Sequence, residues 1–300
     1  MKTRTSPGAI ILMLAILCIS FASCEKSSSD EEVSPEEEEF AVTTITAEAE
    51  SEASFSEVFD NVIGVNSELA FGGTGVFAGD RFPGEDGPVN GPDSVRCFTV
   101  SITPLTQGST FPVQVVIDFG AGCTGRDGVT RKGKIITTYT NRLIFPSAEA
   151  ISSFDGYEVN NVKVEGTHRI LNTSTQNSPS FQVTIDGKLS KANGNYSSWK
   201  STRSIKMTQG FSTPHLPADD IFELTGSASA KLSVDNRIRE WSTVVMSPLI
   251  KKFNCRWVVS GQVSLKRNDS GLAVLDYGNG ECDKIATLTV RNRVVIISLD

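Results

Sequence analysis

Residues 181–186 read FQVTID, and this stretch decides the fold class because apolar and polar side chains alternate along it. The same alternation recurs in VQVVIDF at 113–119 and in WVVSGQVSLK at 257–266. A period of two gives a strand one buried face and one wetter face, which is typical of antiparallel sheets. Turn-forming residues separate such runs, at 160–161, 193–194, 235–236, 268–271 and 292. We therefore predict that residues 95–300 form an all-β domain.

Several of the alternating runs are long, among them 196–208 and 221–234. Strands usually have about five or six residues, so longer ones indicate a large curved sheet. We expect a large antiparallel meander of roughly ten to thirteen strands. The sequence leaves open whether this meander is a sandwich or an open barrel-like sheet.

Three segments lie between residue 24 and the β domain. Residues 24–45 are predicted to be a disordered, self-repelling stalk, because their runs 27–32 and 36–39 are rich in serine and acids and lack apolar residues to bury. Residues 46–70 carry apolar side chains mostly three or four apart, which predicts one short N-terminal amphipathic helix that packs on the body. Residues 71–94 are dense in glycine and proline and are interpreted as a linker.

The first residues have the layout of a signal peptide. Lys2 and Arg4 supply a cationic start. The apolar run at 9–22 is shorter than the roughly 20 residues that a membrane-spanning helix needs. Residues 1–23 are therefore interpreted as a signal peptide for export.

The signal peptide ends in FAS directly before Cys24. Small residues ahead of a cysteine resemble the lipobox of bacterial lipoproteins, and the resemblance implies that Cys24 receives a diacylglyceryl group and becomes the new N-terminus. Cys18 is a rival acceptor, and an ordinary secretory signal cut near Ser23 is the other alternative. Several acyl chains would anchor the protein, because one chain binds membranes only marginally.

Four of the six cysteines lie in two similar units of sequence, 97–123 and 255–282. Each unit is predicted to have a cysteine at the start of one strand, a turn and a returning strand. The returning strand ends in DFGAG or DYGNG, near the second cysteine. In an antiparallel hairpin these ends come together, within reach of the roughly 5.5 Å Cα separation of a disulfide. We predict disulfides Cys97–Cys123 and Cys255–Cys282, as suits an oxidising compartment.

The glycine loops of these units also carry carboxylates. Asp118 and Asp127 flank the first loop, and Asp276 and Asp283 flank the second. Calcium takes six to eight oxygen ligands, so these four residues are weak calcium candidates. The EF-hand spacing is absent, and glycine here is explained more simply by turns and bulges beside a disulfide. We expect no resident metal and no cofactor.

Residues that suit catalysis are few. The only two histidines, His168 and His215, are too few for a three-histidine zinc site, and no G-x-S-x-G occurs. Asp219-Asp220 with Glu223, or Glu165 with another carboxylate, could serve a glycosidase, which needs two carboxyl groups about 5 to 10 Å apart. We expect a protein that is not an enzyme, and we keep a carboxylate-dependent hydrolase as the alternative of a different class.

Exposed aromatic side chains on long strands would suit glycan binding, because sugar rings stack on flat aromatic faces. Tyr196, Trp199 and Trp241 are the candidates, and Trp199 is preferred because its strand face is largely polar. The competing interpretation makes each tryptophan a core anchor. The alternative function is therefore a glycan-binding module of a polysaccharide uptake system.

The charge of the chain is uneven. Residues 25–60 hold thirteen acids and one lysine, which is more negative charge than the −7 of the whole chain, so residues 61–300 have a small positive balance. This balance does not suit a nucleic-acid partner. The lipobox, acidic stalk and β-rich body together resemble Bacteroidota-type lipidated envelope lipoproteins. The resemblance implies an outer-membrane lipid anchor, periplasmic or surface-facing, and a non-catalytic binding or structural role with a glycan or another envelope protein as partner.

Overall fold

The computed structural model describes residues 33–65, 98–125, 128–175, 179–210, 212, 219–253 and 255–299. The chain there forms one helix and a series of strands. Their bounds are α1 Pro35–Ile63, β1 Thr99–Pro104, β2 Val113–Asp118, β3 Cys123–Thr124, β4 Thr130–Tyr139, β5 Glu149–Val159, β6 Val162–Asn172, β7 Ser180–Ser190, β8 Tyr196–Gln209, β9 Ile221–Val234, β10 Arg237–Lys252, β11 Ser260–Arg267, β12 Ser270–Asn279, β13 Ile285–Val290 and β14 Arg293–Ser298.

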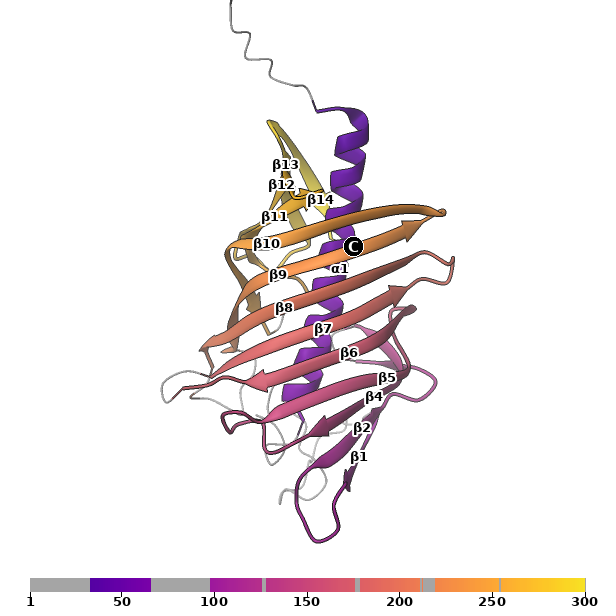
Figure 1. Ribbon diagram of the computed structural model, residues 1–300, viewed down its shortest axis with the longest axis vertical. Helices are drawn as coiled ribbons and strands as arrows, with labels where there is room; N and C mark the ends of the chain where they lie inside the picture. The colour runs from indigo at the N-terminus through magenta and orange to yellow at the C-terminus, as the bar shows by residue number, and fades with distance from the viewer. Residues whose placement is uncertain are drawn as a thin grey trace, which may run out of the picture. The chain divides into compact units, whose positions relative to one another are not determined.

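The strands form a single 14-stranded sheet in which consecutive strands are neighbours (Figure 1). The path runs from β1 to β14, with β3 paired to β4 beside it. Every pairing is antiparallel. Because β1 and β14 are the two ends of the path, the sheet is not closed. The predicted all-β antiparallel meander is confirmed, and it is one open sheet.

Three of the predicted turns join their strands with two residues in the left-handed region. They are Asn160-Asn161 between β5 and β6, Asp235-Asn236 between β9 and β10, and Asn268-Asp269 between β11 and β12, with φ from 48° to 66°. A two-residue turn with positive φ at both central residues has a twist that matches the twist of antiparallel strands. Asn and Asp tolerate positive φ well. These residues therefore set where the meander reverses.

The helix begins earlier than predicted. Ser34 caps it, with its side chain accepting a hydrogen bond from the Glu37 backbone N–H while the Glu37 carboxylate accepts from the Ser34 N–H, and Pro35 opens the first turn. This capping box and a proline at the first helical position are strong helix starts. Residues 35–45 of the predicted disordered stalk are thus helical, which corrects that part of the prediction.

The acidic run does not repel itself into a stalk because arginines of the sheet lie against it. We call three contacts the rim pairs, and they are Glu37–Arg291 at 2.9 Å, Glu38–Arg293 at 2.6 Å and Glu39–Arg239 at 2.7 Å. Acids in the first turn are also favoured by the helix dipole. The neutralising partners come from strands far along the chain, so the acidic run alone could not indicate them.

The helix crosses the sheet from its last strands toward its first, as Figure 1 shows behind β5–β10. Its start meets Arg291 and Arg293 at the β13–β14 hairpin. Near its other end, Tyr139 of β4 donates a hydrogen bond to the Val62 carbonyl oxygen at 2.8 Å. Within the described ranges, no helical segment combines the length and apolar character that crossing a membrane requires.

The core lies between α1 and the facing side chains of the strands. Phe55 stacks on Trp199 with ring centroids 5.6 Å apart, and Phe59 meets Phe181 edge to face, also at 5.6 Å. Gly187 of β7 allows this approach, because a Cβ there would lie 2.0 Å from the Phe55 ring. The predicted packing of the helix on the body is confirmed.

Some predictions concern residues outside the described ranges. These are the signal peptide, Cys24 and residues 25–32, residues 66–70 and the linker at 71–94, whereas the helix itself ends at Ile63 with Gly64 as its C-cap, short of the predicted bound at 70. They stay predictions from the sequence.

Candidate functional site

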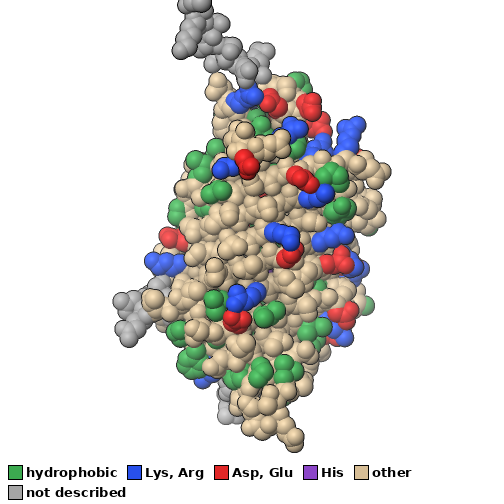
Figure 2. Space-filling view, viewed as in Figure 1, with side chains coloured by type: hydrophobic (Ala, Val, Ile, Leu, Met, Phe, Trp, Pro, Cys, Tyr) green, Lys and Arg blue, Asp and Glu red, His purple; other side chains and the backbone are tan. Residues whose placement is uncertain are grey.

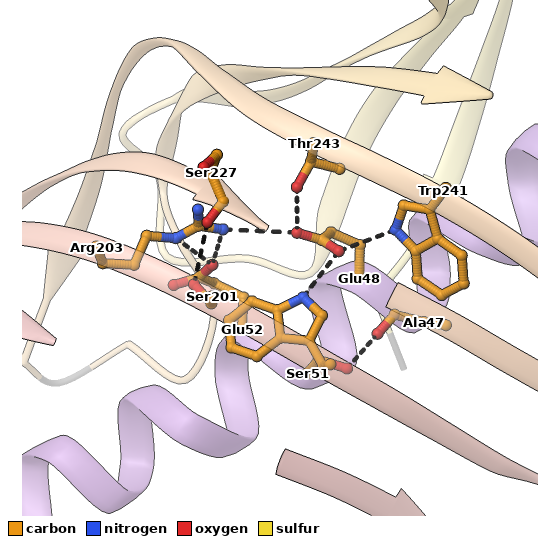
Figure 3. A network of polar contacts seen from close by, with 10 residues as sticks. Ala47, Glu48, Ser51, Glu52, Ser201, Arg203, Ser227, Trp241 and Thr243 are labelled. Atoms are coloured by element: carbon orange, nitrogen blue, oxygen red, sulfur yellow. Dashed lines mark hydrogen bonds and ion pairs between the residues drawn. The ribbon is translucent and has the colours of Figure 1, made fainter. Parts of the chain in front are cut away.

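The side chains richest in chemistry meet at the middle of α1 (Figure 3). We call them the inner network, and they are Glu48 and Glu52 of α1, Trp199 and Arg203 of β8, and Trp241 and Thr243 of β10. The Glu48 carboxylate accepts hydrogen bonds from Trp199 Nε1 at 2.9 Å and Trp241 Nε1 at 3.0 Å. Its other oxygen accepts from Thr243 Oγ1 at 2.6 Å. One helical acid thereby joins two strands.

Arg203 provides the countercharge of the inner network. Its Nε and Nη2 donate to one carboxylate oxygen of Glu52 at 3.0 and 2.7 Å, and Nη2 lies 3.5 Å from Glu48 Oε1. Within the described structure, Arg203 Nη1 is buried without a hydrogen-bond partner. A buried guanidinium between two carboxylates costs desolvation of all three groups, which the contacts offset only because their geometry is good.

Burial sets the electrostatics of this network. Loss of water raises the pKa of Glu48, and the charge of Arg203 and the Thr243 and Trp241 hydrogen bonds oppose that rise. For Arg203 burial acts against its charge, but the Glu52 and Glu48 carboxylates outweigh it and raise its pKa. Breaking one contact would therefore expose its partner to the full cost of an unpaired buried charge.

The tryptophans are core residues, which corrects their proposed role as glycan platforms. Trp199 is 0% exposed, with Phe55 stacked on it and the Arg203 guanidinium 5.5 Å from its ring centroid. Trp241 is 4% exposed. Tyr196 is half-buried with the Lys188 ammonium 4.6 Å from its ring centroid. The polar face of β8 lies inward because the helical acids require polar partners there.

A second charged cluster holds the C-terminal half of α1. Glu57 accepts hydrogen bonds from Arg131 Nε of β4 at 2.7 Å and from the Tyr157 hydroxyl of β5 at 2.9 Å. Asp60 pairs with Lys251 of β10 at 2.9 Å. Since residues 57 and 48 lie about half a turn apart around the helix, the sheet supplies charged partners to both sides of α1.

Asp220 lies at the edge of this second cluster, directly before β9. Burial, with Asp219 and Asp60 nearby, raises its pKa from 3.8 to about 7. Asp220 is 3% exposed, and a Cβ on Gly210 would lie 1.9 Å from its Oδ1. A carboxyl group with this pKa suits a general acid, but the group is closed off by its own chain.

Other acids of the hydrolase alternative lie apart from one another. Glu165 of β6 pairs with Lys163 at 2.7 Å, and Glu223 is on β9 opposite Lys206. His168 is fully buried, and burial lowers its pKa to about 3, so its imidazole is neutral. His215 lies outside the described residues. Among the described residues, the structure therefore does not gather these predicted groups into one accessible site.

The second cysteine unit forms the predicted disulfide, Cys255–Cys282, with Cα atoms 5.5 Å apart. It spans the β11–β12 hairpin, as expected from the sequence. Cys123 is also disulfide-bonded. Cys97 lies outside the described residues, so the pairing of Cys97 with Cys123 stays a prediction.

The weak calcium candidates that are described serve as turn residues. Asp118 accepts a hydrogen bond from the Gly120 N–H, and Asp276 accepts one from the Gly278 N–H, each at 2.8 Å. Asp283 accepts from the Ile285 N–H at 2.9 Å, and Asp127 lies outside the described residues. In the part of the chain that the structure describes, no three His, Cys, Asp or Glu side chains are grouped to hold a metal ion.

Sequence reasoning missed the charged residues that hold α1. Arg203 lies on the same face of β8 as Ile205 and Met207, and Arg131 lies on the same face of β4 as Ile135. Each arginine therefore occupies a core-facing position. An arginine on the apolar face of a strand is a usable signal, because it requires a buried acid as partner. Acids within the apolar pattern of the helix were the complementary signal.

In comparisons with known proteins, the chain matches no family model, and neither a curated protein nor a solved structure is significantly similar to it.

Proposed function

We propose that the protein is an exported envelope protein, anchored to the outer membrane through lipid on Cys24, with a non-catalytic binding or structural role. The anchor follows from the signal peptide and lipobox-like end at residues 1–24. The Cys255–Cys282 disulfide suits the oxidising compartment that export implies.

One observation carries the non-catalytic part of the proposal. The charged groups of the inner network, Glu48, Glu52 and Arg203, hold α1 in the sheet and are almost wholly buried. Catalytic groups need access to substrate, whereas these groups are satisfied by one another. The outward face of β5–β10 instead carries charges of both signs (Figure 2), with pairs such as Lys200–Asp186.

Metabolic labelling with an alkyne fatty acid tests the anchor. We expect the wild-type chain and Cys18→Ser to incorporate the label and Cys24→Ser to lose it. Label that persists in Cys24→Ser and disappears in Cys18→Ser would contradict the assignment of the acceptor.

A substrate panel tests the non-catalytic role. We expect no turnover of glycosides or esters by the purified protein. Turnover that Asp220→Asn or another single acid substitution abolishes would contradict the proposal and support the hydrolase alternative.

A further inference from the structure

The last hairpin of the sheet carries aliphatic side chains on its outward face. Ile285 is 54% exposed, Val294 is 63% exposed and Ile296 is 74% exposed. We call these three residues the hairpin patch. In the β13–β14 register, Val294 lies opposite Thr289 and Ile296 opposite Thr287, so the patch and these threonines share one face. The alternate residues Val295 and Ile297 turn toward the core.

The outward faces of the central strands differ from this hairpin. Among the described residues, β6–β9 have no large hydrophobic side chain that is exposed. Their outward positions carry residues such as Thr184, Lys200 and Thr202. Exposed aliphatic residues are therefore absent from the described β6–β9. They occur on the last hairpin and also on β1, β5 and β10, at Ile102, Ile151, Ile238, Val244 and Met246, and Ile296 and Val294 are the most exposed of them.

The hairpin patch lies next to the start of the helix. Arg291, in the turn between β13 and β14, contacts Glu37 at 2.9 Å, and Arg293 at the start of β14 contacts Glu38 at 2.6 Å. Val294 immediately follows Arg293. These contacts join the hairpin that carries the patch to the first turn of the helix. The described structure begins just before that turn, at Val33.

The chain between Cys24 and Val33 limits how far an anchor at Cys24 lies from this hairpin. Nine residues fully extended span at most about 32 Å. An anchor at Cys24 therefore keeps Val33 within about 32 Å of the lipid surface, and the turn of the patch hairpin contacts the helix that starts beside Val33. This tether gives a weak surface contact a high effective concentration.

We propose that the hairpin patch rests on the lipid surface in which Cys24 is anchored, with Val294 and Ile296 entering its headgroup region. The proposal rests on the proposed lipid anchor. Three side chains are too few for a stable contact between two proteins, which buries about 1,200 Å² or more. Contact with a bilayer needs less buried area, because the lipid anchor already supplies most of the affinity and the apolar side chains only add to it.

Thiol accessibility tests the proposal on the full lipidated chain in vesicles of phosphatidylethanolamine and phosphatidylglycerol. Ile296→Cys probes the patch, and Thr184→Cys on the outward face of β7 is the matched control. The protein without an added cysteine gives the background. We expect a water-soluble maleimide to label Ile296→Cys about tenfold more slowly than Thr184→Cys, as burial of one aliphatic position predicts. In Cys24→Ser, which is not lipidated, the two rates should be equal.

The outcomes separate this proposal from the anchor itself. Mass analysis of the N-terminal peptide first establishes whether Cys24 carries lipid, and an unlipidated Cys24 overturns both proposals. A lipidated chain whose two sites label equally overturns the membrane contact alone. Protection of Ile296→Cys that rises with protein density at constant lipid, together with a cross-linked dimer, identifies a second copy as the occupant and also overturns the proposal.

Discussion

The rim pairs at the start of α1 and the inner network at its middle are both built from acids of the helix and arginines of the sheet, but their surroundings differ. At the rim, the side chains of Glu38 and Arg293 are 21% and 59% exposed, whereas those of Glu52 and Arg203 in the inner network are 5% and 2% exposed. Exposed pairs contribute about 0 to 1 kcal/mol. Breaking a buried pair costs about 3 to 5 kcal/mol, because the remaining charge stays buried. The position of an acid along α1 therefore decides its importance.

The largest expected effect comes from Arg203→Met, which leaves two buried carboxylates without a countercharge. We expect the free energy of unfolding to fall by about 3 to 5 kcal/mol in urea titrations. Lys206→Met, at an outward position of the same strand, is the matched control and should change it by less than about 0.5 kcal/mol. Equal losses in the two variants would show that the inner network is not special.

A smaller effect concerns pH and Asp220. Its pKa is about 7 in the folded chain against an ordinary 3.8, so the unfolded chain releases this proton first as pH rises. Because of this carboxyl group, the free energy of unfolding falls as pH rises from about 4 to about 7, and the contribution then levels off. Asp220→Asn should remove that part of the slope in urea titrations at a series of pH values. An unchanged slope would mean that Asp220 titrates normally.

Steric fit beneath the helix predicts the next effect. Gly187→Ala puts a methyl group against the Phe55 ring, and we expect a loss of about 1 to 3 kcal/mol. Phe55→Leu in the same chain should recover part of that loss, since it removes the ring. Gly271→Ala, where a Cβ meets nothing within 4 Å, is the control. Thermal unfolding measures all three, and an equal effect of both glycine substitutions would contradict the close approach of α1.

The smallest effect is expected at the rim. Arg293→Gln removes the partner of Glu38, and we expect a loss of less than about 1 kcal/mol that shrinks further in high salt. Urea titrations at low and high ionic strength measure it. A loss as large as that of Arg203→Met would remove the distinction between rim and interior.

Local signals in the sequence predicted much of the fold. Alternation in 181–186 indicated a strand, and the turn at Asn160-Asn161 is where the left-handed conformation is needed. The start of the helix was missed although Ser34 and Glu37 form a capping box and Pro35 follows the cap, because four consecutive acids indicated a solvated segment. Their arginine partners are more than 190 residues away, and single-sequence patterns carry no such pairing.

The candidate site was predicted less well, for a related reason. Ser197, Trp199 and Ser201 made one face of β8 look outward, yet these positions are buried. Trp199 and Arg203 of that face bind Glu48 and Glu52 of the helix, so the face lies inward. Hydrophobic alternation assumes an apolar interior. Here a charged helix is the interior, so the strand that faces it is polar on its buried side.

A pair of double-mutant cycles tests this account most directly. One cycle combines Glu52→Gln with Arg203→Met, and the other combines Glu38→Gln with Arg293→Gln, each measured by urea unfolding. We predict a coupling energy of about 2 to 3 kcal/mol for the first pair and less than about 0.5 kcal/mol for the second. Similar small couplings in both cycles would contradict the claim that the buried charges hold α1 within the sheet.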